Sequence, residues 1–187
     1  MKSKLISIIG APSSGKSTLA SSVHTELKKT GYNSIFVGEC ATDYIAEYGL
    51  PNTPIDQMVI FYKQLTKEKM FMGTKEFIVC DSSSLLNYFY FRTQFPTNLS
   101  NKDIATINHL QKEILKSITN WTHIFYVPPI LKNIDDGIRY HDQEGILRLD
   151  RWIKSYLELE NIPHVDLSKI DINDRLNYIV EKLTNKK

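Results

Sequence analysis

Cysteine is scarce in this chain of 187 residues, which contains only Cys40 and Cys80. The two cysteines lie far apart in the sequence and form no C-x-x-C pair, and the five histidines do not cluster with them. These residues therefore indicate neither a disulfide framework nor a zinc site. Because free cysteine is among the most buried residue types, we expect two buried thiols.

Long apolar runs are also absent. The run "LISIIG" near the N-terminus is too short for a signal peptide or a membrane span, and it leads straight into a glycine-containing loop. Lysine and arginine total 23 against 21 acidic residues, and this net charge of +2 gives no reason to expect a broad nucleic-acid or membrane-binding surface. We expect a cytoplasmic protein without membrane contact. A short basic groove for nucleic acid stays open, as does the oligomeric state.

The chain does contain a regular alternation of short apolar runs and longer amphipathic stretches. This pattern is typical of an α/β fold, and we expect a five-stranded, mainly parallel sheet flanked by helices in a single domain over residues 1–187. The expected strands are 4–10, 33–39, 76–82, 122–129 and 163–168, and the expected helices are 16–29, 54–72, 84–94, 101–119, 143–160 and 171–184. Asp171 is expected to cap the last helix, and the polar segment 130–143 is a candidate lid.

The strongest motif is "GAPSSGKST" at residues 10–18, which fits G-x-x-x-x-G-K-[ST] between an expected strand and an expected helix. In such a loop, backbone N–H groups surround phosphates at the positive end of the following helix. Lys16 is expected to bind the β- and γ-phosphates of ATP, and the Ser17 hydroxyl to bind Mg²⁺. The expected ATP-binding residues are Gly10, Ser13, Ser14, Gly15, Lys16, Ser17 and Thr18.

Asp81 ends the apolar run "FIVCD" and is the best candidate for a second Mg²⁺-site residue. Mg²⁺ prefers oxygen ligands and usually takes one or two carboxylates, directly or through water. Asp81 is also a candidate general base for an attacking hydroxyl. An alternative role, compatible with both, is to cap the helix that begins near Ser84.

Three kinds of protein carry such a loop: GTP switches, hydrolytic motors and small-molecule kinases. A GTP switch should have a D-x-x-G element and a guanine-selecting N-K-x-D, but Asp81 precedes "SSS" and the only late Asn-Lys pair lies in the terminal tail without a following Asp. A motor usually has a second acidic residue beside the metal-site Asp, where this chain has Ser82. The sequence therefore favours a kinase.

A kinase also needs an acceptor pocket and a lid that neutralises the transferring phosphoryl group. Glu39 and Asp43 lie four residues apart after the second expected strand, where they could bind sugar hydroxyls or simply serve helix capping and solvation. Arg139 in the candidate lid is the expected catalytic arginine, since a guanidinium binds phosphate oxygens bidentately. Arg148 and Arg151 on the helix behind it are alternatives.

These segments together resemble the P-loop kinase family that includes the ribosylnicotinamide kinase domain of bacterial NAD-biosynthesis regulators, often grouped with AAA-like small ATPases. The similar parts are "GAPSSGKSTLA", Glu39 to Tyr44, "DQMVIFY", "IVCDSS", "IDDGIRYHDQEGILRLDRWI" and "NIPHVDLS". The resemblance implies a nucleoside-kinase-like fold that uses ATP and Mg²⁺ to phosphorylate a nucleoside 5′-hydroxyl. It gives Lys16 and Ser17 the ATP and metal roles, Asp81 the metal and acceptor hydroxyl, Glu39 and Asp43 the acceptor, and Arg139 the lid.

Two positions depart from the family pattern, which tends to have an arginine at Thr42 and a second acidic residue at Ser83. Both departures fall on the acceptor side. The resemblance implies a kinase of ribosylnicotinamide or a related nucleoside, and the departures leave the ATP side of this expectation intact. The alternatives are a kinase of deoxynucleotides or modified nucleic-acid bases, and an ATP-binding regulatory ATPase without an acceptor.

Overall fold

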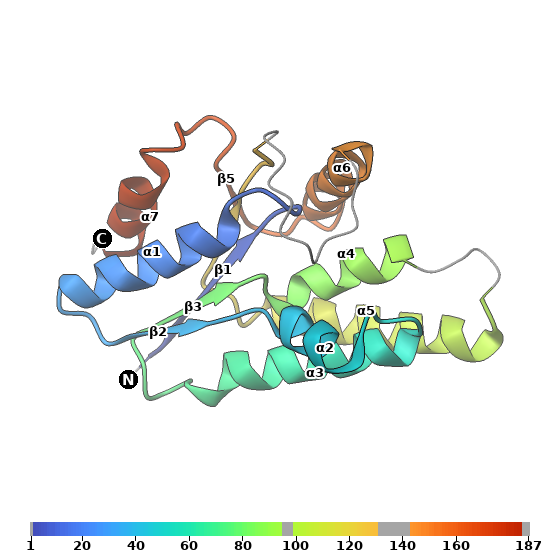
Figure 1. The fold of residues 1–187 in the computed structure, drawn as a ribbon. Coiled ribbons are helices and arrows are strands. Elements are labelled where there is room, and N and C mark those ends of the chain that lie inside the picture. The colour runs from blue at the N-terminus through green and yellow to red at the C-terminus, as the bar shows by residue number, and fades with distance from the viewer. Residues whose placement is uncertain (1, 95–98, 131–142, 185–187) are drawn as a thin grey trace.

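The computed structural model describes residues 2–94, 99–130 and 143–184. Within these ranges five strands form one parallel sheet in the order β2-β3-β1-β4-β5 (Figure 1). The strands are β1 (Lys4–Ile9), β2 (Ser34–Val37), β3 (Phe77–Asp81), β4 (His123–Tyr126) and β5 (Val165–Asp166). Each lies inside an expected strand, so the predicted five-stranded parallel sheet is confirmed.

The helices of the described residues also follow the predicted order, with one addition. They are α1 (Lys16–Lys29), α2 (Cys40–Tyr48), α3 (Pro54–Met70), α4 (Ser84–Gln94), α5 (Asn101–Ile118), α6 (Gln143–Leu159) and α7 (Arg175–Thr184).

 The addition is α2, which is not among the expected helices. Its nine residues are too few for a clear period, and its N-cap residue Glu39 makes no side-chain capping bond.

The last helix begins later than predicted. Asp171 was expected to cap a helix over 171–184, but α7 begins at Arg175. The Asp171 carboxylate instead accepts a hydrogen bond from the backbone N–H of Asn173 at 2.9 Å, which closes a local turn ahead of the helix. A short polar side chain can satisfy a nearby amide in a turn as well as at a helix end, so the sequence signal marks either structure.

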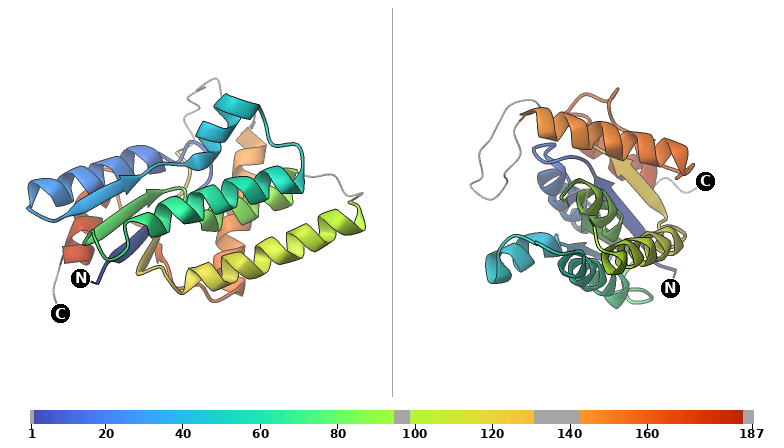
Figure 2. Two further views of the ribbon diagram at one scale, coloured as in Figure 1. Left: turned by 90° about the horizontal axis from the view of Figure 1, so that it is seen from below. Right: turned by 90° about the vertical axis from the view of Figure 1, so that its right-hand side faces the viewer.

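Helices cover both faces of the sheet (Figures 1 and 2). The alternation of side chains along β1 divides the core: Ile6 and Ile8 pack with α1 and α7 on one face, whereas Ile9 packs with α3, α4, α5 and α6 on the other. Every one of these three isoleucines is fully buried. Cys40 and Cys80 are buried free thiols, as predicted.

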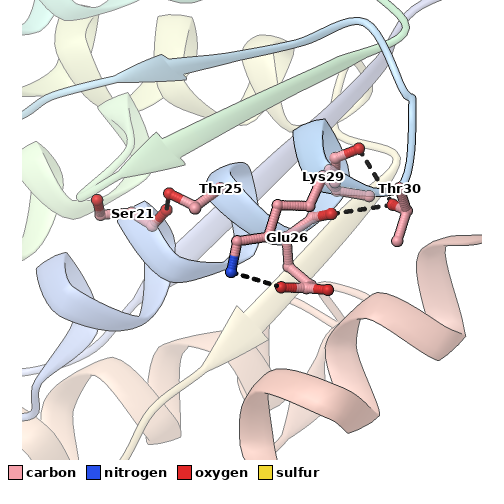
Figure 3. A network of polar contacts seen from close by, with 6 residues as sticks. Ser21, Thr25, Glu26, Lys29 and Thr30 are labelled. Carbon is pink, nitrogen blue, oxygen red and sulfur yellow. Dashed lines mark hydrogen bonds and ion pairs between the residues drawn. The ribbon is translucent and has the colours of Figure 1, made fainter.

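Helix α1 carries the phosphate-loop motif at its beginning and a solvent-facing network at its other end (Figure 3). There Thr30 Oγ1 donates to the Glu26 carbonyl at 2.9 Å, and Lys29 Nζ lies 3.4 Å from the Glu26 carboxylate. The Thr30 bond satisfies a backbone carbonyl that the helix end leaves open, and the Lys29 contact is a surface ion pair. Among the described residues, no helix combines the length and apolar character that a membrane span requires.

Candidate active site

The loop between β1 and α1 is tightly built around two glycines. A Cβ placed on Gly10 would overlap the carbonyl oxygen of Val127 and would lie 3.0 Å from Ser14 Oγ. Ser13 and Gly15 adopt left-handed backbone conformations, with φ of 58° and 76°. The Ser13 carbonyl accepts a hydrogen bond of 3.1 Å from Ile130 N, which attaches the loop to the segment after β4. Close packing and left-handed turns explain why the motif needs glycines here.

The inner side of this loop carries polar groups that suit phosphate oxygens. Ser14 Oγ is buried and has no hydrogen-bond partner among the described residues, although buried hydroxyls normally have one. Lys16 is only 2% exposed, an unusual state for an ammonium group. No side chain caps the beginning of α1, so its first N–H groups face the loop without a side-chain acceptor. This donor set fits the phosphates of a nucleotide.

Asp81 lies at the carboxyl end of β3, beside the loop. Strands β1 and β3 are neighbours, and Asp81 pairs in register with Ile8, two residues before Gly10. Its side chain is 5% exposed. Because the carboxyl ends of parallel strands meet at one edge of the sheet, Asp81 and the phosphate loop share the crevice where such folds bind ligands.

The three serines after Asp81 turn the chain into α4. Ser82 has φ of 51° and donates its backbone N–H to the Ile8 carbonyl at 3.2 Å. Ser83 is fully buried, and its Oγ accepts a hydrogen bond of 2.7 Å from Ser7 Oγ. At the position where the resembling family tends to have a second acidic residue, this chain therefore has a small hydroxyl packed against β1.

The residue that caps α4 is Glu68 of α3, which sequence reasoning missed. Glu68 Oε1 accepts a hydrogen bond of 2.6 Å from Ser84 N, and Oε2 accepts one of 2.8 Å from Ser84 Oγ. Asp81 is thus not needed as the cap. Burial raises the pKa of the Glu68 carboxyl to about 7, against the opposite effect of the bonds from Ser84. A signal was present, since the buried face of α3 carries Gln57, Gln64 and Glu68 among apolar residues.

The two acceptor-side candidates lie at the start of α2 in different surroundings. Glu39 is the N-cap residue, and its carboxylate accepts a hydrogen bond of 3.3 Å from Thr42 Oγ1. The Asp43 side chain is 71% exposed and forms an ion pair of 2.9 Å with Lys67 of α3. Asp43 and Lys67 line a groove of about 700 Å³ between α2 and α3 whose described lining includes neither Lys16 nor Asp81.

The arginine candidates are only partly accounted for. Arg139 and most of the candidate lid 130–143 lie outside the described residues. Arg148 and Arg151 are exposed on α6, where Arg151 Nε donates to the Leu147 carbonyl at 3.3 Å. The structure therefore assigns no arginine to phosphate.

The oxygen atoms around the loop are suited to a Mg²⁺ ion that is also bound by phosphates and water, rather than to a metal ion whose ligands all come from the protein. Among the described residues, no three His, Cys, Asp or Glu side chains gather in a way that could hold a metal ion. Mg²⁺ usually keeps several waters and takes one or two carboxylates together with substrate phosphates. The Ser17 hydroxyl, which follows the loop, and the Asp81 carboxylate supply hard oxygen atoms of this kind.

A parallel sheet with a glycine loop between its central strand and a helix, and a carboxylate at the end of the neighbouring strand β3, is the arrangement of a P-loop nucleotide-binding fold. The particular family follows from sequence. Residues 5–175 match the model of the AAA domain family, and the chain belongs to that family. No curated protein sequence matches the chain significantly.

Solved structures confirm the fold at low sequence identity. A NadR protein in complex with NR superposes with a TM-score of 0.76 at 19% identity, covering 99% of this chain and 52% of that one. A NadR protein in complex with NAD and AMP-PNP gives 0.69 at 16% identity, covering 99% and 50%. Deoxyadenosine kinase from M. mycoides with bound dATP gives 0.62 at 15% identity, covering 99% of this chain and 100% of that one. The chain thus spans about half the length of the NadR chains.

Proposed function

We propose that this protein is an ATP- and Mg²⁺-dependent kinase that transfers the γ-phosphoryl group to a nucleoside-like small molecule, with ribosylnicotinamide or a related nucleoside as the first candidate acceptor. One observation carries the proposal: a buried phosphate loop, whose Ser14 hydroxyl has no hydrogen-bond partner within the described part of the chain, lies beside the Asp81 carboxylate. Ser82 follows where a hydrolytic motor usually has a second acidic residue. The likeness to a NadR protein in complex with NR supports the choice of acceptor.

In this mechanism the loop holds the donor nucleotide. Lys16 and the N–H groups at the start of α1 bind the β- and γ-phosphates, and the Ser14 hydroxyl donates to a phosphate oxygen. Ser13, Gly15 and Thr18 complete the binding loop. Mg²⁺, held by Ser17 and Asp81, would neutralise charge on the phosphates.

Asp81 has a second role at the acceptor. Its carboxylate orients the acceptor hydroxyl and takes its proton while the hydroxyl oxygen forms a bond to the γ-phosphorus and the bond from that phosphorus to the bridging oxygen of ADP breaks. Arg139 is proposed to neutralise the transferring group from the lid. Positioning and electrostatics supply most of the acceleration in such a reaction.

Glu39 and Asp43 are proposed to bind the hydroxyl groups of the acceptor. Glu39 is the stronger candidate, because it lies two residues after the end of β2, whereas the Asp43 carboxylate is engaged by Lys67. In both positions a carboxylate would accept hydrogen bonds from a sugar, and such charge-assisted bonds are stronger than neutral ones.

A second candidate function is phosphorylation of a deoxynucleoside or nucleotide. The likeness to deoxyadenosine kinase with bound dATP favours it, since that chain is covered along its full length. A third candidate, an ATP-binding regulatory ATPase without an acceptor, is compatible with membership of the AAA domain family.

A panel of acceptors separates these functions. ADP release is measured with ATP and Mg²⁺ alone and then with ribosylnicotinamide, ribonucleosides, deoxynucleosides and nucleotides, and each product is identified by mass. We expect ribosylnicotinamide or a related nucleoside to raise ADP release well above the basal rate. Stimulation only by deoxynucleosides or nucleotides would support the second function. Basal release that no acceptor raises would overturn the kinase proposal.

A further inference from the structure

Two polar side chains on the buried face of α3 bind the beginnings of two other helices. Gln64 Oε1 accepts a hydrogen bond of 2.8 Å from Cys40 N, the first residue of α2. Glu68, one turn later, accepts bonds from both the backbone N–H and the hydroxyl of Ser84, the first residue of α4. Gln64 and Glu68 are each 1% exposed, so these contacts are shielded from water.

The two bound helices are those that leave the strands carrying the proposed site residues. Helix α2 follows β2 through Glu39, directly before Cys40, and α4 follows β3 through Asp81, three residues before Ser84. Both helices lie on the same side of the molecule as α3 (Figure 2). Helix α3 thus binds two segments at the points where each leaves the carboxyl edge of the sheet.

Two other helices, α3 and α5, are capped locally. Thr53 and Asp56 form a reciprocal capping box at α3, and Ser100 and Asp103 form one at α5. The amides at the starts of α2 and α4 are instead bound by side chains that come from α3. A local cap stabilises a helix wherever the helix lies, whereas a cap supplied by another helix also determines where the two lie relative to each other.

The choice of a carboxylate at position 68 is informative. A neutral amide suffices at Gln64, where one N–H must be bound, and a buried carboxylate is the more costly group. Ser84 presents two donors at once, its backbone N–H and its hydroxyl. A carboxylate accepts both, whereas a glutamine would accept from the N–H and donate to the Ser84 hydroxyl oxygen. A glutamine reverses the direction of one of the two bonds, so Glu68→Gln is a milder change than Glu68→Leu.

We propose that Glu68 is a positioning residue for the proposed phosphoryl transfer: by binding Ser84 it fixes the turn after β3 and so holds the Asp81 carboxylate against the phosphate loop. Gln64 has the corresponding role for Glu39. This inference rests on the proposed function. It assigns Glu68 no contact with ATP, metal or acceptor.

The test compares Glu68→Leu and the milder Glu68→Gln with Asp103→Ala, which removes a carboxylate cap from α5. Steady-state kinetics with the acceptor identified for the wild type are measured together with Tm and amide hydrogen exchange. We expect Glu68→Leu to lower kcat roughly 10- to 100-fold, since small misplacements of reacting groups have effects of this size. Glu68→Gln should fall between it and the wild type, and KM for ATP should stay within about twofold because the loop belongs to β1 and α1.

Asp103→Ala should lower Tm and leave kcat unchanged. Exchange at residues 82–84 should rise at least about tenfold in Glu68→Leu and stay unchanged in Asp103→Ala. Gln64→Leu should raise the acceptor KM more than it lowers kcat. If Glu68→Leu fails to fold, Glu68→Gln provides the same comparison.

Two results would overturn the inference without affecting the proposed kinase function. One is that the Glu68 variants have a lower Tm but the wild-type kcat. The other is that residues 82–84 exchange at the wild-type rate in Glu68→Leu. A wild type without acceptor-dependent transfer would overturn the proposed function, and the inference with it. The wild-type assay therefore decides the function, and the comparison of variants decides the role of Glu68.

Discussion

The donor side and the acceptor side of the proposed site are built in opposite ways. The phosphate loop follows the central strand β1 and contains Ser14 and Lys16, which are 1% and 2% exposed. On the acceptor side, α2 follows the edge strand β2, and the Asp43 side chain is 71% exposed. The donor side consists of closely packed backbone turns, whereas the acceptor side consists of side chains on a surface helix.

This difference has a physical consequence for specificity. Replacing a residue in a densely packed loop strains its neighbours, so the donor side tolerates little change. An exposed helix such as α2 can exchange side chains with small effects on stability. Of the two departures from the family pattern, only one lies at an exposed position. Thr42 is exposed on α2, whereas Ser83 is fully buried beside β1.

The largest expected effect belongs to the donor side. Lys16→Ala should lower turnover by roughly 10²–10³-fold, because a preorganised cation that stabilises phosphate charge is lost. The matched control is Lys29→Ala at the other end of the same helix, where the side chain is 68% exposed and makes a surface ion pair with Glu26 (Figure 3). Acceptor-dependent ADP release measures both variants. Equal turnover in the two would remove the phosphate loop from the mechanism.

Replacing one glycine on each side by alanine tests the difference in packing through the free energy of unfolding. Gly10→Ala should lower the free energy of unfolding by about 1–3 kcal/mol and weaken ATP binding, because the added methyl overlaps the Val127 carbonyl. Gly38→Ala, after β2, meets nothing nearer than Phe36 Cε1 at 3.6 Å and should change stability by less than about 0.5 kcal/mol. Urea denaturation and ATP titration measure both. Similar losses in the two variants would contradict the contrast in packing.

The pH dependence of stability tests Glu68, which supports the donor side. Its carboxyl has a pKa of about 7 in the folded protein, raised from 4.5, so the folded state binds the proton more tightly than the unfolded state. The stabilisation that comes from this tighter proton binding is fully present below pH 4.5 and is lost as the pH rises to 7. The stability of the wild type minus that of Glu68→Gln should therefore fall by about 3 kcal/mol across this window.

Denaturant unfolding of both proteins at several pH values gives this difference. Subtracting the variant removes the contributions of other titrating groups, including Asp56 and Asp166, whose pKa values are lowered in the folded state. A difference that stays constant from pH 4.5 to 7 would show that Glu68 titrates normally and is not held in the buried contact with Ser84.

The smallest expected effects are on the acceptor side. Glu39→Gln should raise the acceptor KM by about tenfold, the size of one lost charged hydrogen bond. Asp43→Asn should raise it by less than about threefold, because Lys67 already engages this carboxylate. Both should leave the KM for ATP unchanged. A larger effect at Asp43 than at Glu39 would move the acceptor toward the groove between α2 and α3.

Much of the fold was predictable because its signals are local. The apolar runs identified the five described strands, and the helix expected from Pro54 does begin there as α3, behind a capping box. The helix α2 was missed and the start of α7 was placed too early because their boundaries depend on other contacts: Cys40 N is bound from α3, and Asp171 closes a turn. The assigned roles of the site residues stay predictions.

By itself, the sequence determined the alternation of strands and helices and the phosphate loop, because periodicity and glycine requirements act over a few residues. Only the tertiary structure decided that Asp81 lies level with Ile8 on the neighbouring strand, that Asp43 pairs with Lys67, and that Glu68 binds the start of α4. Strand order and burial bring together residues that lie far apart along the chain, and no local pattern records which partner a buried carboxylate will have.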